Sequence, residues 1–566
     1  MIVLRMEITA LGDLAWRVSV GGEVSDITLA HVLQTAEAIR RAKLVGVREL
    51  VPAFTTVTVH MTPESAGDIV RAGLEAICAT LADKLSTDLP AGADREIPVV
   101  YGGNEGPDLE AVAQHHAQTP GEIAAMHAAA GYRVHAIGFS PGFPYLAGLP
   151  LTLHTPRRAT PRTRVPAGSV GIGGGQTGVY PMAGPGGWNL IGRTTRRMFD
   201  VNARPPAWLQ VGDRVRFVDA RNHPPSGDEQ RSLLAQAASR EPATPGHVVE
   251  VLDGGMACSV QDIGRWGWQA QGVSVGGATD GAALQVANLI VGNALGAAGL
   301  EWTMRGPRLL FHGETDVALT GAIVRGLTNG KRLRMQAGEV LDLSGARGGG
   351  CRGYVAFAGG LLVPEVLGSR STDLRASFGG FDGRLLRAGD TLPLTSGPVG
   401  RHCSTGWRVT PSLACASDEA DDSWDIRIMR GPDAAEFSDL AWKVFLGESF
   451  RVSSQSDRMG MRLDGARLPS GFAKEPISAG VAVGAVQVPP DGTPIILLAD
   501  RQTLGGYPQI AYVIAADQSR LAQAVPGRSL SFRVVESDEA ERARHAQLKD
   551  LRQLKLGLEH LRHRNA

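Results

Sequence analysis

Cysteine is scarce in this 566-residue sequence, and the five copies lie far apart: Cys78, Cys258, Cys351, Cys403 and Cys415. An odd number of cysteines without a CxxC pair argues against a disulfide framework or a zinc site and favours reduced thiols. No apolar run approaches the roughly 18 residues that a membrane span needs. The first residues carry Arg5 and Glu7 in place of the apolar core of a signal peptide. We therefore expect a soluble, cytoplasmic protein without membrane contact.

The sequence also has no net charge, because it contains 57 Lys and Arg residues and 57 Asp and Glu residues. The sequence lacks the basic field typical of nucleic-acid-binding proteins, so we expect no such partner. Aromatic residues make up 5%, whereas 72 glycines are spread without a G-X-Y period, which excludes collagen. With 43% hydrophobic residues the chain can bury a core and is not globally disordered. This composition favours a turn-rich, mainly β protein.

Two glycine motifs fail a chemical test for the sites they suggest. Gly138–Gly142 matches G-x-S-x-G, but the residue after the serine is Pro141, which has no N–H for an oxyanion hole. Gly173–Gly178 contains G-x-G-x-x-G, but Val179–Pro181 follows where a dinucleotide site needs a helix. That run is left as either an ordinary turn between strands or a backbone cradle for an anion.

Other common motifs are absent. Lys331 is followed by Arg332, which excludes a Walker A motif, and there is no HExxH or EF-hand loop. None of the 12 methionines precedes a lysine, so the chain has no Met-Lys-Met biotin attachment site. We therefore expect no metal site and no covalently attached biotin.

Residues 1–85 predict a small α/β domain. Alternating apolar residues indicate three strands, at Ile2–Thr9, Ala15–Val20 and Thr55–His60. Ser25 is a candidate N-cap for an amphipathic helix that reaches Lys43, and Thr62 for a second helix that reaches Leu81. The order ββαβα suggests a ferredoxin-like sandwich.

Residues 96–220 predict a β-barrel or sandwich. One helix begins at the capping box Thr119–Glu122 and ends at Gly131. Glycines and prolines then separate short strands up to Val218, a spacing that a parallel sheet would not show. The polar, proline-rich residues 221–247 predict a linker.

The segment 248–535 is again β-rich, with one strong helix over Thr279–Gly292 and Asp280 near its N-cap. The polar stretch Ser417–Ser423 is a candidate boundary between two subdomains. Residues 536–566 predict a charged helix whose leucines follow a 3-4-3 spacing: Leu551, Leu554, Leu558 and Leu561. This helix either packs on its own or a neighbouring domain or forms a coiled coil.

Three segments could carry chemistry. Four arginines fall within Arg157–Arg164 and could contact phosphate or carboxylate, or lie in a solvated loop. Ser259–Arg265 and Ser456–Arg462 each set an Asp and an Arg at a glycine turn. The Asp–Arg pair either stabilises the turn or binds a ligand. The sequence leaves both alternatives open.

Longer strings resemble two known families. Phe139–Leu146, Thr160–Ile172 and Gly174–Pro181 resemble the KipI family, also called allophanate hydrolase subunit 1. Strings similar to the KipA family, subunit 2, are Ser259–Arg265, Gly277–Asp280, Ser456–Arg462 and Leu498–Pro508. Over about residues 1–535 the chain is identified as a member of the fused KipI–KipA type. The resemblance implies a small N-terminal α/β domain followed by cyclophilin-like β-barrels, one in the KipI half and two in the KipA half.

The resemblance also implies three functions. The leading one is the B–C component of an ATP-dependent 5-oxoprolinase that uses ATP with Mg and acts with a separate A component of the LamB/YcsF family. The alternatives are the carboxyltransferase component of a biotin-dependent, urea-carboxylase-like enzyme and a non-enzymatic regulator that binds a histidine kinase. Allophanate amidase activity is not expected, because none of the seven lysines lies in an amidase-type Gly/Ser-rich string. Self-association is left open.

The predicted site lies where the KipI and KipA halves meet. The predicted catalytic residues are Gln261, Asp262 and Arg265. The predicted ligand-binding residues are Phe139, Phe143, Arg157, Arg162, Gly173, Gly174, Gly175, Gln176, Asp457 and Arg458. In this hypothesis the glycine run and Arg157–Arg164 hold phosphate, while Gln261 and Arg265 hold the lactam carboxylate. The alternative for Arg265 is that it braces its own turn through Asp262.

Overall fold

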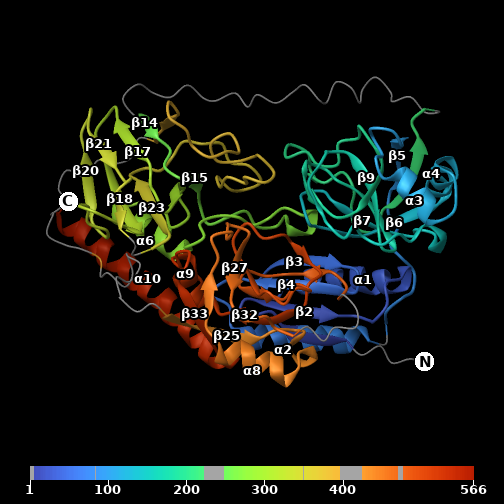
Figure 1. Cartoon of the computed structure of the whole chain (residues 1–566). Coiled ribbons are helices and arrows are strands. Elements are labelled where there is room, and N and C mark those ends of the chain that lie inside the picture. The colour runs from blue at the N-terminus through green and yellow to red at the C-terminus, as the bar shows by residue number, and fades with distance from the viewer. Residues whose placement is uncertain are drawn as a thin grey trace.

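The computed structural model describes residues 6–82, 84–221, 248–347, 350–395, 409, 423–469 and 476–565. Apart from Arg221 and Ser423, the expected linker 221–247 and the expected boundary Ser417–Ser423 lie outside these residues. The described strands form an N-terminal unit, a first barrel, a two-sheet unit and a second barrel, mainly β with α+β character as predicted (Figure 1). Within these ranges, no helix has the length and apolar character that crossing a membrane requires.

The N-terminal unit is an antiparallel sheet of order β1-β2-β4-β3 that contacts two helices. Ser25 caps α1 as predicted, because its Oγ accepts the N–H of Thr28 at 3.1 Å. Strands β2 and β3 flank β4, antiparallel to both, and α1 connects them, which is the split βαβ of a ferredoxin-like sandwich. The elements are β1 (Glu7–Ala10), β2 (Ala15–Ser19), α1 (Asp26–Ala42), β3 (Val47–Ala53), β4 (Thr56–Met61) and α2 (Gly67–Leu81).

Two expectations for this unit are wrong. The predicted order ββαβα lacks β3, in which Glu49 and Pro52 interrupt the apolar residues. The second helix begins at Gly67 and Thr62 does not cap it, because the hydroxyls of Thr62 and Ser65 bond each other at 2.8 Å. Ser65 Oγ also donates to Gly46 O at 3.1 Å, so the chain turns here before the helix starts.

The first barrel closes in the order β10-β7-β6-β13-β5-β12-β9. The predicted capping box is present at α4, where Thr119 N donates to Glu122 Oε2 at 2.7 Å and Glu122 N donates to Thr119 Oγ1 at 3.2 Å. The barrel strands are β5 (Asp94–Tyr101), β6 (Gly131–Ile137), β7 (Pro144–Ala147), β9 (Ser169–Gly173), β10 (Gln176–Val179), β12 (Asn189–Arg193) and β13 (Arg214–Asp219). Outside the ring lie α3 (Leu109–His115), α4 (Pro120–Ala129), β8 (Arg162–Val165) and β11 (Gly184–Gly186).

The two-sheet unit packs a four-stranded sheet, β21-β17-β14-β24, and a five-stranded sheet, β15-β16-β23-β18-β20, around one apolar core. It differs from the expected barrel, because its described strands form two sheets and no closed ring. The predicted helix is α6, with Asp280 Oδ1 accepting the N–H of Ala283 at 3.0 Å. The strands are β14 (Val248–Asp253), β15 (Ala257–Gln261), β16 (Gly299–Thr303), β17 (Arg308–Phe311), β18 (Thr315–Gly321), β20 (Arg332–Met335), β21 (Val340–Asp342), β23 (Arg352–Phe357) and β24 (Thr391–Pro393); the helices are η2 (Gln269–Gln271) and α6 (Gly281–Val291), and β19 (Ile323–Val324) pairs with β22 (Ala346–Arg347).

The second barrel closes in the order β25-β32-β29-β30-β27-β26-β33. Its first and last strands, β25 and β33, are parallel neighbours, as are β5 and β13 in the first barrel, so the two rings are closed in the same way. The strands are β25 (Ser423–Arg430), β26 (Phe450–Val452), β27 (Gly460–Asp464), β29 (Ala485–Gln487), β30 (Ile495–Leu497), β32 (Gln509–Val513) and β33 (Ser529–Val534). The other elements are η3 (Ala434–Glu436), α8 (Asp439–Gly447), β28 (Ala479–Gly480), β31 (Leu504–Gly505) and α9 (Ala515–Ala522).

The predicted C-terminal helix is α10 (Ser537–Asn565), which packs on three units of the same chain (Figure 1). Ala540 packs against Met429 of the second barrel, and Leu551 joins an apolar cluster with α6. The guanidinium of Arg544 donates to Ser65 O of the N-terminal unit at 2.8 Å. These contacts correspond to the packed alternative that the sequence left open.

The two halves of the chain share a buried polar contact. Glu49 of β3 accepts the N–H of Gln269 at 2.5 Å and its Nε2 at 2.9 Å. Arg501 of the second barrel donates to Gln269 Oε1 at 2.8 Å. Leu11 and Ala15 also enter an apolar cluster with residues of the second barrel. The N-terminal unit therefore packs directly against the C-terminal half.

Candidate functional site

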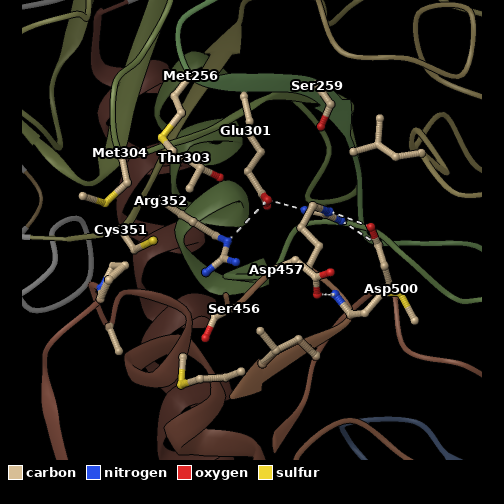
Figure 2. Close-up of a pocket in the computed structure, with 18 of the residues that line it drawn as sticks. Met256, Ser259, Glu301, Thr303, Met304, Cys351, Arg352, Ser456, Asp457 and Asp500 are labelled. Atoms are coloured by element: carbon tan, nitrogen blue, oxygen red, sulfur yellow. Dashed lines mark hydrogen bonds and ion pairs between the residues drawn. The ribbon is translucent and has the colours of Figure 1, made fainter. Parts of the chain in front are cut away.

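A cavity of about 500 Å³ lies between the two-sheet unit and the second barrel (Figure 2). The two-sheet unit contributes strand and loop residues to one wall, and the second barrel contributes the turn before β27 and the segment after β30 to the other. Its charged lining residues are Glu301, Arg352, Arg375, Asp457, Arg458 and Asp500. Such a volume, with a few convergent polar groups, is typical of a small-molecule site.

Arg458 is the centre of the charged network in this cavity. Its Nε and Nη2 donate to the two oxygens of Asp500 at 2.8 and 2.9 Å, which is a bidentate pair. Its Nη1 donates to Glu301 and, at 3.0 Å, to Thr279 Oγ1, and its Nη2 donates to Gly277 O at 2.6 Å. Burial opposes the charge, but the two carboxylates outweigh it and raise the pKa of Arg458 above its ordinary value.

Glu301 stands buried on β16 and stays ionised. It accepts the O–H of Tyr354 and the N–H of Thr279, both at 2.8 Å, and lies 3.8 Å from Arg352 Nε. Burial disfavours its charge, but Arg458 and Arg352 outweigh burial and hold the pKa of Glu301 below its ordinary value. Figure 2 shows this carboxylate joined to Arg352 and to the network that ends at Asp500.

Asp500 differs from Glu301, although both bond the same guanidinium. Burial is the largest influence on Asp500 and raises its pKa above the ordinary value, despite the opposing effect of Arg458. Two carboxylates whose pKa values are pushed apart are suited to different tasks. The neighbouring arginines favour the charged form of Glu301, whereas burial favours the neutral form of Asp500, which is therefore better suited to gain and release a proton.

The remaining walls are mostly apolar or neutral. Met256, Met304, Met459 and Met461 line the cavity, and flexible methionines adapt to irregular ligands. Cys351 also lines it, but burial raises the pKa of this thiol, so it is a poor nucleophile. Within the described residues no group of three or more His, Cys, Asp or Glu could hold a metal ion.

The predicted catalytic residues Gln261, Asp262 and Arg265 are not part of the cavity lining. Asp262 accepts hydrogen bonds from Ser369 Oγ at 2.7 Å, Ser371 Oγ at 2.5 Å and Arg370 N at 2.6 Å. Fully buried Arg265 donates to Ser371 O at 2.5 Å and to Val366 O at 3.4 Å, and its guanidinium lies 4.8 Å from the Phe378 ring. Gln261 is also fully buried and donates to Ser259 Oγ at 2.9 Å. These contacts favour bracing of segment 366–371, and the catalytic roles stay predictions.

The predicted ligand-binding residues of the first barrel lie in different surroundings. Phe143 is buried among Tyr180 and Trp188, and Arg162 forms a bidentate pair with Asp108 at 2.8 Å for both bonds. Arg157 is exposed. Phe139 alone reaches the lining of the cavity, because its ring lies 4.7 Å beneath the Arg375 guanidinium.

The predicted glycine run forms the turn of the β9–β10 hairpin. Gly173 pairs with Gln176 across the hairpin, and Gly174 and Gly175 make the turn. The N–H of Gly174 donates to Thr155 O at 2.8 Å, so this amide is engaged within the protein. The arrangement is that of the ordinary turn, and a role for these residues in holding an anion stays a prediction.

Of the predicted site residues, Asp457 and Arg458 line the cavity. Four further charged lining residues escaped the sequence prediction: Glu301, Arg352, Arg375 and Asp500. Glu301 and Arg352 lie in otherwise apolar strands, which is a usable signal because buried charges are rare unless paired. Asp500 stands within Leu498–Pro508, one of the strings that carry the family resemblance.

Two family models match the chain. A carboxyltransferase domain, subdomain C and D, matches residues 6–209, and a carboxyltransferase domain, subdomain A and B, matches residues 271–534. Most of the cavity lining, including its charged residues, lies within the A and B match, whereas Met256, Ala257 and Ser259 precede that match and Phe139 belongs to the C and D match.

Curated relatives match each half separately. The C subunit of the Escherichia coli 5-oxoprolinase is 39% identical over 315 residues, which are 54% of this chain and 97% of that protein. The B subunit of the Bacillus subtilis 5-oxoprolinase is 38% identical over 228 residues, which are 38% of this chain and 94% of that protein. A crystal structure of the protein TTHA0988 matches 92% of this chain and 99% of its own, with 34% identity and a TM-score of 0.77.

Proposed function

The chain belongs to the carboxyltransferase-domain family and joins relatives of the B and C subunits of 5-oxoprolinase in one polypeptide. From that premise we propose that it is the combined B–C component of an ATP-dependent 5-oxoprolinase, which opens the lactam of 5-oxo-L-proline to give L-glutamate. The observation that carries the proposal is that both of these relatives are matched over more than nine-tenths of their own length by different halves of one chain.

The cavity supports this function through its chemistry. A lactam with a carboxylate is small, partly apolar and anionic, and the cavity combines methionine side chains with three guanidinium groups. Lactam opening must place a proton on the ring nitrogen as its bond to the carbonyl carbon breaks. Asp500, whose pKa burial raises, is the group best suited to that transfer, while Arg458 holds it in place.

ATP would supply the driving force by activating the lactam oxygen. Two of the groups predicted to hold phosphate are engaged within the protein, because Arg162 is paired with Asp108 and the Gly174 amide donates to Thr155 O. We therefore derive no step through ATP on this chain. The proposal assigns ATP and Mg to the assembly with a LamB/YcsF-family A component in the cytoplasm, where the phosphate site would be completed.

The test is reconstitution. The purified chain is mixed with a LamB/YcsF-family protein, MgATP and 5-oxo-L-proline, and glutamate is measured against mixtures that lack ATP or the LamB/YcsF-family protein. We expect glutamate only in the complete mixture. No glutamate from a mixture whose assembly is verified by gel filtration would overturn the proposal.

The carboxyltransferase alternative is tested in the same experiment. A second set of mixtures contains biotinylated carrier protein, bicarbonate, ATP, a biotin carboxylase and urea. Carboxylation of urea in this set, without glutamate in the first, would replace the proposed reaction. Tight binding to a histidine kinase without turnover in either set would favour the regulatory alternative.

A further inference from the structure

The three guanidinium groups that line the cavity are not equally engaged. Arg458 is paired with Glu301 and Asp500, and Arg352 donates to Ala522 O at 2.8 Å and lies 3.8 Å from Glu301. The Arg375 guanidinium makes no hydrogen bond and no ion pair within 4.0 Å to any residue in the described ranges. Among the described lining residues, Arg375 is therefore the guanidinium without an ion pair, and its fork is available to a ligand.

Arg375 is held in place by both halves of the chain. Its backbone N–H and that of Ala376 donate to Asp373 Oδ1 at 3.1 and 2.8 Å, which fixes the loop. The Phe139 ring lies 4.7 Å from its guanidinium, within the range of a cation–π contact. Phe139 has a φ of +66°, an unusual conformation for a large residue, and this conformation belongs to the turn that presents its ring. The first barrel thus orients a cation of the two-sheet unit.

The surroundings of Arg375 leave its charge only partly compensated. Burial lowers the pKa of Arg375, and the groups that oppose this effect are Asp373, Tyr145 and Asp457. A partly buried cation with no close anion gains when a ligand anion pairs with it. A guanidinium fork fits a carboxylate with two parallel hydrogen bonds.

Resting on the proposed function, we propose that Arg375 binds the carboxylate of the substrate and that Phe139, from the other half, fixes its orientation. The cavity then selects cyclic amides that carry a carboxylate next to the ring nitrogen over neutral amides of the same size. Asp457 complements this selection, because its Oδ1 accepts the N–H groups of Met459 and Gly460 at 2.8 and 3.0 Å. Asp457 lines the cavity, and its other oxygen is suited to accept the lactam N–H.

Binding to the full-length chain tests the proposal by calorimetry with two ligands, 5-oxo-L-proline and 2-pyrrolidinone, which is the same lactam without the carboxylate. We expect the wild-type chain to prefer 5-oxo-L-proline. Arg375→Gln should weaken 5-oxo-L-proline binding about 10- to 100-fold, the range for a hydrogen-bonded charge pair, and change 2-pyrrolidinone binding less than about 2-fold. Arg375→Lys should recover only part of the loss, because it keeps the charge without the fork.

Two further variants separate positioning from folding. Phe139→Leu keeps an apolar side chain but removes the ring face, and should weaken 5-oxo-L-proline binding about 3- to 10-fold. Arg387→Gln is the matched control, because Arg387 is an exposed arginine outside the cavity lining, and its binding should equal that of the wild type. Equal loss of both ligands in Arg375→Gln, or no loss of either, would overturn the inference.

The results of these binding experiments can be told apart from the results of the reconstitution that tests the proposed function. Binding that depends on Arg375, without glutamate formation in the reconstituted mixture, would keep the inference and overturn the reaction. Glutamate formation with an unchanged KM for 5-oxo-L-proline in Arg375→Gln would keep the reaction and overturn the inference. A wild-type chain that binds neither ligand, alone or with the LamB/YcsF-family protein, would overturn the inference as well.

Discussion

Two turns of this chain carry an Asp and an Arg beside a glycine, and the fold uses them differently. The turn at Asp262 and Arg265 is buried, and its carboxylate and guanidinium both form hydrogen bonds with segment 366–371. The turn at Asp457 and Arg458 opens on the cavity, and its guanidinium bonds carboxylates that come from two other strands or segments.

The difference lies in the partners of each turn. Arg265 finds main-chain carbonyls, which are neutral and local to the loop it supports. Arg458 finds Glu301 and Asp500, so charges from the two-sheet unit and the second barrel meet across an interface. A short motif fixes which groups are present, whereas distant strands decide whether those groups support the backbone or face a ligand.

The largest effect that separates the turns is expected from Arg458→Met. It leaves Glu301 and Asp500 buried without their shared cation, and breaking a buried ion pair in this way costs about 3–5 kcal/mol of the free energy of unfolding. Urea denaturation measures the loss. The double variant Glu301→Gln with Arg458→Met removes one of the orphaned charges and should recover part of it. A single variant as stable as the wild type would contradict the assigned network.

A smaller effect is expected from Arg265→Lys. Lysine keeps the charge but loses the fork that holds Ser371 O and the stacking on Phe378, so the unfolding free energy should fall by about 1–3 kcal/mol. Activity per folded molecule should not change. Thermal denaturation and turnover are measured on one preparation. Lost activity with an unchanged melting temperature would restore the role in carboxylate binding that the sequence first suggested.

The pH dependence of stability should distinguish the two carboxylates of the Arg458 network. The pKa of Glu301 is lowered in the folded chain, so its stabilisation is present above its ordinary value of 4.5 and is lost as pH falls below that value. The pKa of Asp500 is raised above 3.8, so stability falls as pH rises from 3.8 through its folded pKa.

Glu301→Gln and Asp500→Asn should therefore change the slope of stability against pH in opposite directions. Each slope should change by at most about 1.4 kcal/mol per pH unit, and the free energy of unfolding summed over the titration should change by about 1.4 kcal/mol for every unit of pKa difference between the folded and unfolded chain. Urea denaturation between pH 3 and 7 measures both slopes. Slopes that change in the same direction would contradict the pKa assignment.

Cutting the chain within 222–247 is expected to have the smallest effect, because the two halves should stay associated. Gln269, four residues after Arg265, bonds Glu49 and Arg501, so the buried turn lies beside the contact between the halves. The halves should elute together in gel filtration after cleavage at an inserted protease site. Fusion at roughly millimolar effective concentration aids assembly but does not replace these contacts. Elution as two separate species would contradict the packed arrangement.

Local signals in the sequence were reliable where one residue decides a structure. Ser25 and Thr119 cap their helices as predicted, and α6 begins after Asp280, because capping depends on neighbours within four residues. The β3 strand was missed, since Glu49 faces a partner more than 200 residues away and reads as a surface charge.

The site was predictable only in part for the same reason. Arg458 was found because its turn has a recognisable composition, and Asp500 stood in a family string without a role. Glu301 and Arg352 belong to adjacent paired strands, and their significance depends on the register of β16 and β23. Arg375 could not be identified from its surroundings in sequence, because the ring that orients it comes from Phe139 in the other half.

The parallel closing strands of the two barrels have a consequence for how the chain matures during synthesis. Asp94 pairs alongside Arg214, and Ser423 alongside Ser529, so each ring joins segments more than 100 residues apart. A ribosome releases the chain from its N-terminus, so each barrel stays an open sheet with exposed edges until its last strand emerges. The last strands to be translated, β13 and β33, therefore close the two barrels during synthesis. Before each of them emerges, the open sheet has unpaired strand edges that a chaperone can protect.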